Sequence, residues 1–279
     1  MIRRPPRSTR KESSAASDVY KRQGRATKKT NIVSVLAISH FLGLVIILVL
    51  APLMAEEFKT NDFFLGVLAS SFGLMGLTLL YRGLAKSPMA IVAPITAVAC
   101  ATLPVGWGLF SGEKLATQQV VGVFVGLLAI FLVSWTPGKR TSIKGLLILE
   151  ALIAGFSFGA FFIVIDGTSE TTAPWPVVGS RVFSVLAIFL FVIIRKKSIK
   201  PEGNSTPYII GAGFFDTLAN IALLAALNKG LLSLVSILAS FYPAVTVLLA
   251  RLFLKEIMST SQLIGLALGL TSIGLLAVS

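Results

Sequence analysis

From residue 32 to its end, the chain alternates long apolar runs with short polar turns. A helix rises ~1.5 Å per residue, so ~20 apolar residues cross the hydrocarbon core of a bilayer. Nine runs approach or exceed that length, and they predict nine transmembrane helices, over 32–53, 62–84, 89–110, 116–135, 144–166, 174–195, 206–228, 231–253 and 260–278. Because no polar stretch after residue 31 is long enough for a soluble domain, the pattern predicts an all-α integral membrane protein.

The apolar runs contain an internal repeat. A shift of 143 residues places 84–134 on 227–277 without a gap, and the polar and small residues that coincide are Glu113 with Glu256, Gln119 with Gln262, Gly122 with Gly265, and Gly126 with Gly269. In so apolar a chain, polar identities at equal spacing indicate a repeat more strongly than apolar identities do. We therefore predict two halves of five helices each, 24–135 and 144–279, joined by a linker at 136–143.

Residues 1–23 stand where this repeat requires the first helix of the first half, yet they are polar. They lack the apolar segment of a signal peptide, and they resemble a translated sequencing adapter. We interpret them as a foreign, disordered segment. The natural protein is then expected to have ten helices, of which this chain shows nine.

Composition agrees with a membrane protein and narrows its partners. The chain is 55% hydrophobic and 13% charged, with a mean hydropathy of +0.86. In a soluble protein a net charge of +13 would point to nucleic acid, but here the positive residues flank membrane spans. We expect a lipid bilayer as the surroundings and no nucleic-acid partner. The single cysteine, Cys100, excludes an internal disulfide and a multi-cysteine metal site, and we expect no cofactor.

Lysine and arginine are divided unevenly between the two sets of alternate loops. One set holds only Lys59, Lys114 and Lys229, whereas the other holds thirteen, namely Arg25, Lys28, Lys29, Arg82, Lys86, Lys139, Arg140, Lys144, Arg195, Lys196, Lys197, Lys200 and Lys255. Basic loops stay in the cytoplasm, so we predict a cytoplasmic linker and an outer C-terminus. Five helices per half is an odd number, so the second half inserts upside down. Inverted halves with a site at their interface are typical of secondary transporters.

Three stretches resemble the EamA family of the drug/metabolite transporter superfamily. They are YRGLAKSPMAIVAP (81–94), GLFSGEKLATQQVVGV (108–123) and DTLANIALLAALNKGLLSLVSILASFYPAVTVLLARLFLKE (216–256). The resemblance covers about residues 24–279 and implies ten helices in two inverted halves, which move small metabolites, often outward. It also implies a bacterial-type cytoplasmic (inner) membrane. Members of the family are often drawn with both termini in the cytoplasm, which differs from the orientation that loop charge predicts.

Four polar residues within the spans are candidates for the substrate site. Asp216 is a carboxylate near the middle of its span, where charge is costly and marks function by default; the alternative is a structural hydrogen bond, with Asn220 one turn away as helper. Arg181 either binds an anionic substrate group or pairs with Asp216 or Asp166. His40 is either a proton-sensitive group or a histidine satisfied by its neighbours.

Aromatic residues and prolines supply further candidates. Trp107, Phe241 and Tyr242 lie close to helix prolines, where they either line the cavity or serve in helix contacts. Proline frees the carbonyl four residues back and tends to kink a helix, so kinks are expected at Pro94, Pro104 and Pro243. Near the span ends, Glu150 is expected to pair with Lys144 or reach the interface, Glu113 and Glu256 to cap turns, and Ser259 with Gln262 to form a capping box.

The function predicted from these features is a secondary transporter that exports a small organic metabolite by alternating access, with a proton as the candidate coupled ion. An enzyme needs a cluster of acid, base or metal-binding residues, and the chain has one histidine, one cysteine and no such cluster. A phosphate-binding G-x-x-x-x-G-K-[ST] loop, which ATP-driven transport uses, is absent from the sequence. The alternative is a non-transporting membrane scaffold or sensor.

Overall fold

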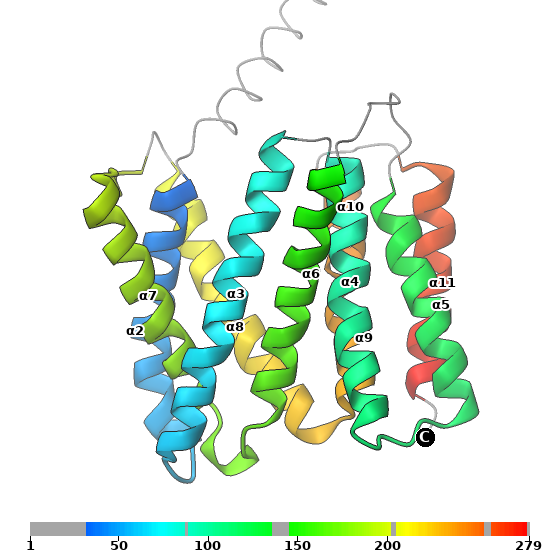
Figure 1. The fold of residues 1–279 in the computed structure, drawn as a ribbon, viewed down its shortest axis with the longest axis horizontal. Coiled ribbons are helices and arrows are strands. Elements are labelled where there is room, and N and C mark those ends of the chain that lie inside the picture. The colour runs from blue at the N-terminus through cyan, green and yellow to red at the C-terminus, as the bar shows by residue number, and fades with distance from the viewer. Residues whose placement is uncertain (1–31, 87–88, 136–144, 202–204, 254–257, 278–279) are drawn as a thin grey trace, which may run out of the picture.

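The computed structural model describes residues 32–86, 89–135, 145–201, 205–253 and 258–277, and throughout these ranges the regular elements are helices (Figure 1). They are α2 (Ile32–Met54), α3 (Thr60–Lys86), α4 (Met89–Phe110), α5 (Thr117–Ser134), α6 (Gly145–Asp166), the 3-10 turn η1 (Glu170–Thr172), α7 (Trp175–Arg195), α8 (Thr206–Lys229), α9 (Leu232–Ala239), α10 (Tyr242–Phe253) and α11 (Thr260–Ala277). The predictions for residues 1–23 and the 136–143 linker fall outside these ranges.

Eight of these helices are long and apolar enough to cross a membrane, which confirms the prediction of an all-α membrane protein. The expected span 231–253 needs a correction, because it consists of two shorter helices, α9 and α10, separated at Ser240 and Phe241. Pro243 lies directly after this break. It has no N–H to donate to the carbonyl of Ala239, so the helical hydrogen bond between the two residues cannot form.

Two glutamines begin equivalent helices in the same way. The Gln119 side chain accepts the N–H of Ala116 at the start of α5, at 3.0 Å. The Gln262 side chain likewise accepts the N–H of Ser259 at the start of α11, at 2.9 Å, and the N–H of Gln262 donates to the Ser259 hydroxyl at 3.3 Å. The predicted capping box at Ser259 is therefore confirmed. Its counterpart in the first half keeps the glutamine contact.

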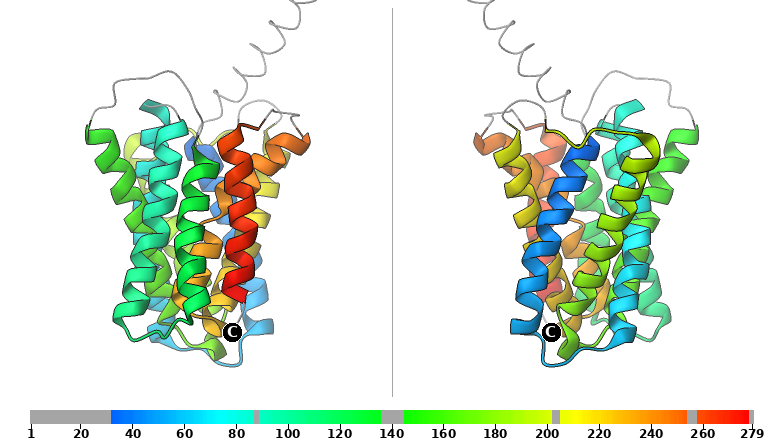
Figure 2. Two further views of the ribbon diagram at one scale, coloured as in Figure 1. Left: turned by 90° about the vertical axis from the view of Figure 1, so that its right-hand side faces the viewer. Right: turned by 90° about the vertical axis from the view of Figure 1, so that its left-hand side faces the viewer.

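The helices α5 and α11 show that the halves are inverted. They lie side by side and antiparallel (Figure 2). A Cβ at Gly122 would lie 2.9 Å from the Leu276 side chain, and a Cβ at Gly265 would lie 2.7 Å from the Val133 side chain. The 143-residue shift relates the two contacts, because Gly122 corresponds to Gly265 and Val133 corresponds to Leu276. Contacts that exchange in this way define a two-fold axis, and two antiparallel partners related by it confirm the inverted repeat.

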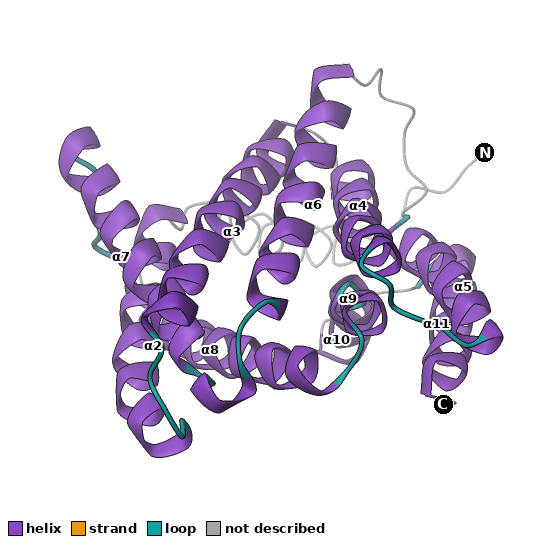
Figure 3. Cartoon of the chain, turned by 60° about the horizontal axis from the view of Figure 1, so that its bottom comes forward, coloured by secondary structure: helices purple, strands orange, loops and turns teal. Residues whose placement is uncertain are grey.

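The other helix contacts follow the same symmetry. Three pairs of counterparts pack against each other: α2 with α7, α4 with α9, and α5 with α11 (Figure 3). The contact of α3 with α7 has its counterpart in that of α8 with α2. Helix α6 packs on α3 and α4. Its counterpart under the repeat is the segment 1–23, outside the described ranges.

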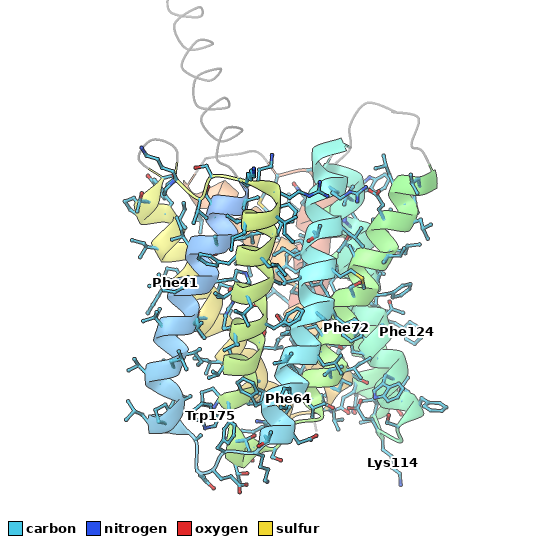
Figure 4. The ribbon with its side chains drawn as sticks, turned by 60° about the vertical axis from the view of Figure 1, so that its left-hand side comes forward. Phe41, Phe64, Phe72, Lys114, Phe124 and Trp175 are labelled. Carbon is cyan, nitrogen blue, oxygen red and sulfur yellow. The ribbon has the colours of Figure 1, made fainter. Side chains whose placement is uncertain are left out.

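Apolar side chains fill the bundle and also cover its outside. One buried cluster surrounds Ile47 and Ile165, and another surrounds Ile130 and Ile237. Outward-facing side chains such as Phe124, which is 69% exposed, project from the helices (Figure 4). A bilayer accepts such a surface, because the hydrocarbon of lipid tails takes the place of water.

Candidate functional site

A cavity of about 560 Å³ lies where the two halves meet. Its walls come from six helices of both halves, α2, α3, α6, α7, α8 and α9. Pockets of a few hundred Å³ are the size that holds small organic ligands. The lining residues that carry the argument below are His40, Phe158, Phe161, Phe162, Arg181, Asp216, Asn220, Leu238 and Ala239.

An ion pair forms the polar corner of this cavity. Nη2 of Arg181 on α7 lies 2.5 Å from Oδ2 of Asp216 on α8. Nη1 of the same guanidinium lies 3.2 Å from Nδ1 of His40 on α2. Because arginine can only donate, Nδ1 of His40 accepts, and the ring is neutral with its proton on Nε2. Three helices from both halves therefore meet at one guanidinium.

Asn220 completes the corner from the next turn of α8. Its Nδ2 donates to the backbone carbonyl of Asp216 at 2.8 Å and lies 3.4 Å from Oδ1 of the same residue. The structure thus brings together the four polar residues that the sequence singled out, His40, Arg181, Asp216 and Asn220. A charge buried in a membrane needs such partners, because an unpaired one costs several kcal/mol.

Small residues let the arginine reach this position. A Cβ at Gly43 of α2 would lie 3.3 Å from Nε of Arg181 and 2.5 Å from the hydroxyl oxygen of Thr217. The arginine side chain therefore lies directly against the backbone of α2. Among the described residues, Nε of Arg181 has no hydrogen-bond partner. The Arg181 side chain is 4% exposed, so the protein rather than the cavity surrounds most of it.

Three phenylalanines of α6 form an apolar wall that sequence analysis did not single out. Phe158, Phe161 and Phe162 all line the cavity, and the rings of Phe161 and Phe162 meet edge to face at 6.0 Å. Their spacing of three and four residues places them on one face of a helix. That spacing was the available signal, but phenylalanines are common throughout these apolar spans.

The predicted aromatic candidates lie elsewhere. Trp107 is 49% exposed at the end of α4, beside Phe110. Phe241 is buried in the cluster with Ile130, and Tyr242 begins α10 with 43% exposure. None of the three lines this cavity. Helix α4 continues through both Pro94 and Pro104.

Glutamates near the span ends contact other helices. The sequence predicts that Glu150 pairs with Lys144, which lies outside the described residues, or reaches the interface; its Oε1 lies 3.4 Å from Nη2 of Arg82 on α3. Oε2 of Glu113, in the turn after α4, accepts the N–H of Ser233 at 3.2 Å and so caps α9 of the other half. Glu256, its counterpart, lies outside the described residues.

Polar contacts also join the two halves at the loop between α2 and α3. Oδ2 of Asp62 accepts the N–H of Ser169 at 3.0 Å and the hydroxyl of Thr172 at 2.6 Å. The backbone N–H groups of Glu56 and Glu57 both donate to the Thr171 carbonyl. Hydrogen bonds therefore join the α2–α3 and α6–α7 loops at this end of the bundle.

An exposed ion pair extends the same network. Nζ of Lys59 lies 2.7 Å from Oε1 of Glu57. The hydrogen bond from Lys59, with a second from the Thr171 hydroxyl, lowers the pKa of Glu57 below its usual value. Because both groups are in solvent, the pair adds little to stability.

Long apolar helices in two inverted halves, with a charged corner in a cavity at their interface, define a multi-pass membrane transporter. A sequence model of the EamA-like transporter family matches the chain twice, at residues 14–135 and 145–278. The chain belongs to this family and is a membrane transporter of the drug/metabolite type. The two matches fall on the two halves, and the first begins at residue 14, within the segment 1–23.

Two further likenesses support the repeat and the fold. An uncharacterized protein of Methanocaldococcus jannaschii is 32% identical over 134 residues, which make up 48% of this chain and 96% of that protein. That relative is therefore about as long as one half. A protein of known crystal structure superposes with a TM-score of 0.71 at 16% identity, over 91% of each chain. At this identity the likeness concerns the fold alone.

Proposed function

We propose that the chain is a secondary transporter that exports a small organic metabolite by alternating access, with the cavity between the halves as its substrate site. The observation that carries the proposal is the ion pair of Arg181 and Asp216 at the cavity wall. Ionisable residues within membrane spans are costly and serve transport pathways by default. Here the two charges come from neighbouring helices of the second half, and His40 of the first half contacts the same guanidinium.

Alternating access needs a bundle that closes at one end while the site stays reachable from the other. The contacts of Asp62 with Ser169 and Thr172 join the halves at one end. The contact of Glu113 with Ser233 also joins them, at the α4–α5 turn. These hydrogen bonds supply the closed end, and transport requires that they break when the site opens to that side. A proton is the candidate coupled ion, because the carboxyl group of Asp216 lines the cavity.

The decisive variant is Asp216→Asn, which keeps the size and hydrogen bonding of the side chain but cannot ionise. We expect normal amounts of protein in the membrane and loss of export, measured as metabolites that accumulate in the medium of cells expressing the chain. Asp166→Asn is the matched control, since Asp166 is also a carboxylate of a membrane helix but does not line the cavity. Wild-type export by Asp216→Asn at every pH would contradict the proposal.

The proposed orientation places the chain in a cytoplasmic membrane with the 136–143 linker inside. Loop charge supports it, because the C-terminal ends of α3 and α7, which carry Arg82 and Arg195, lie at one end of the bundle (Figure 1). Lys114 lies at the other end (Figure 4). In intact cells, Lys139→Cys should resist a membrane-impermeant thiol reagent, whereas Gly167→Cys should react. The native Cys100 is buried and provides a low background. The reverse labelling pattern would overturn the orientation.

A further inference from the structure

We propose that the cavity takes an organic cation, an amine or ammonium compound with an apolar body, whose charge binds the free face of the Asp216 carboxylate. The proposal rests on the cavity being the substrate site, and it names the substrate class. Two observations support it. The carboxylate of the ion pair, rather than the guanidinium, is exposed, and phenylalanines of α6 line another wall of the cavity.

The two members of the ion pair differ sharply in exposure. The Asp216 side chain is 49% exposed, whereas the Arg181 side chain is 4% exposed. Arg181 directs one nitrogen at Asp216 and another at His40. A molecule entering the cavity therefore meets the carboxylate, with the guanidinium behind it. The pair acts as a dipole whose negative end faces the cavity, and such an end attracts a cation.

The carboxylate also has acceptor capacity left. Its Oδ2 binds Arg181 at 2.5 Å, whereas Oδ1 has only the long contact of 3.4 Å to Asn220. A carboxylate offers about four lone-pair positions over its two oxygens. An ammonium N–H can thus bind Oδ1 without displacing Arg181. The existing ion pair then stays intact.

An anionic ligand lacks an equivalent route. It would need the guanidinium, but the Arg181 side chain is only 4% exposed. The remaining nitrogen, Nε, faces the backbone of α2, since a Cβ at Gly43 would lie only 3.3 Å from it. That nitrogen is buried. The arrangement therefore favours a cation over an anion of the same size.

The wall of the cavity that α6 forms fits the same ligand. Phe158, Phe161 and Phe162 line the cavity from α6, and the faces of aromatic rings carry negative potential that attracts cations. The rings also accept an apolar body by removing it from water. An anion gains nothing from the ring faces. Charge and apolar surface therefore point to one ligand class, an amine attached to a hydrocarbon or aromatic body.

The test uses three ligands with one body and different charge: 3-phenylpropylamine, 3-phenylpropionate and 3-phenylpropanol. Each is titrated at neutral pH against the purified full chain in detergent, and binding is measured calorimetrically. We expect the amine to bind at least ~10-fold more tightly than the other two. Tighter binding of the propionate, equal binding of all three, or no binding of the amine overturns the proposal.

Variants then test which residues cause the preference for the amine. Asp216→Asn should abolish the advantage of the amine over the alcohol, and Phe161→Leu should weaken the amine severalfold. Asp166→Asn, which lies outside the cavity, should retain wild-type preference. An amine advantage that survives in folded Asp216→Asn protein overturns the proposal. If that variant does not fold, the comparison of the three ligands on the wild-type chain decides.

Uptake into proteoliposomes separates this inference from the proposed function. Labelled 3-phenylpropylamine is followed by counterflow against unlabelled amine. Binding without movement leaves the substrate class standing and contradicts transport. Movement of the propionate or the alcohol without the amine leaves transport standing and contradicts the substrate class.

Discussion

Two counterparts under the repeat, α4 and the pair α9 and α10, respond differently to proline. Helix α4 contains Pro94 and Pro104 and remains one helix of 22 residues. Its counterpart contains only Pro243 and is divided into helices of 8 and 12 residues. Each interior proline removes one helical hydrogen bond. Counting prolines therefore predicts the opposite of what the structure shows.

The difference lies in the neighbouring helix. Helix α6 approaches α4 so closely that a Cβ at Gly155 would lie 2.5 Å from both the Thr96 carbonyl oxygen and the Ala99 side chain. At Gly159 a Cβ would lie 3.0 Å from the carbonyl oxygen of Cys100. That carbonyl is the one that Pro104 frees, so the backbone of α6 covers it. Within the described chain, α9 and α10 have no helix in the position equivalent to α6.

The break between α9 and α10 lies beside the cavity between the two halves. Leu238 and Ala239 line the cavity, and the carbonyl of Ala239 is the one that Pro243 frees. Non-helical backbone at membrane depth is tolerated where it is buried in protein or lines a cavity. The two counterparts therefore respond differently to proline, since α4 remains continuous and the other is divided. In this fold the less supported counterpart is the one next to the site.

We expect the largest effect on stability from a substitution that forces α4 and α6 apart. Gly155→Val would place side-chain atoms on the Thr96 carbonyl and on Ala99, and the backbone of α4 cannot move aside without losing its other contacts. Overpacking of this kind costs ~1–3 kcal/mol or more, so we expect little monodisperse protein after detergent extraction. Gly274→Val is the control, because a Cβ there meets nothing within 4 Å. Equal yields of the two variants would show that the close approach is unimportant.

A double-mutant cycle tests whether α6 supports the proline in α4. A Cβ at Gly159 would lie 3.0 Å from the Cδ atom of Pro104. We expect Gly159→Ala to destabilise the chain by ~1–3 kcal/mol, and Pro104→Ala to relieve part of that cost by removing Cδ. Contacting residues show coupling of ~0.5–3 kcal/mol. Thermal unfolding of the four proteins measures it, and additive shifts would mean that α6 does not act on the proline.

The sequence predicted those parts of the fold and site whose residues are of a type that is rare in an apolar chain. Gln119 and Gln262 do, and they revealed the repeat that the family match and the α5–α11 contacts confirm. Asp216 and Arg181 stand out because charges within spans are rare, although the sequence left their pairing open. The wall formed by Phe158 and its neighbours stayed hidden, because phenylalanine is ordinary in such spans.

The break in the eighth span could not be predicted fully for a different reason. Pro243 marked a place where the helix is weakened, and Pro94 and Pro104 marked two more. In the structure, the backbone of α6 covers the carbonyl that Pro104 frees, and α4 stays continuous there. That information concerns contacts between distant segments, such as Gly159 with Cys100, and the pattern along a single span does not contain it.

We expect an intermediate effect from removing the contact between Glu113 of the first half and the first turn of α9. The side chain of Glu113 accepts the N–H of Ser233 at 3.2 Å, in the way that a capping residue satisfies a free N–H of the first turn. Glu113→Ala should lower stability by ~1 kcal/mol, the usual cost of losing such a cap. Thermal unfolding of the purified chain measures the shift. Glu170→Ala, at an exposed loop glutamate, should leave the unfolding temperature nearly unchanged; an equal shift would remove any special role of Glu113.

The smallest effect is expected from Pro243→Ala. Alanine restores an N–H that can donate to Ala239, a gain of ~0.5–1.5 kcal/mol, but it also frees the unfolded chain at a cost of ~0.4–1 kcal/mol. The two nearly cancel. The backbone at the break is already bonded by other means, since the N–H of Ser240 donates to Ser236 and the N–H of Ala244 to Phe241. We therefore expect the unfolding temperature to stay close to that of the wild type.

Hydrogen exchange in Pro243→Ala distinguishes two causes of the break between α9 and α10. One is the weaker packing of these helices, and the other is the proline itself. If the lack of a neighbour equivalent to α6 within the described residues causes it, the amides of residues 240–242 should exchange in Pro243→Ala as fast as in the wild type. One added hydrogen bond does not supply the packing that α6 gives to α4. If the proline alone causes it, α9 and α10 should join into one helix. Exchange at these amides would then slow by more than ~10-fold, the change that ~1.4 kcal/mol of added protection produces. Pro104→Ala provides the comparison, because α4 is continuous already and its exchange should not change under either cause.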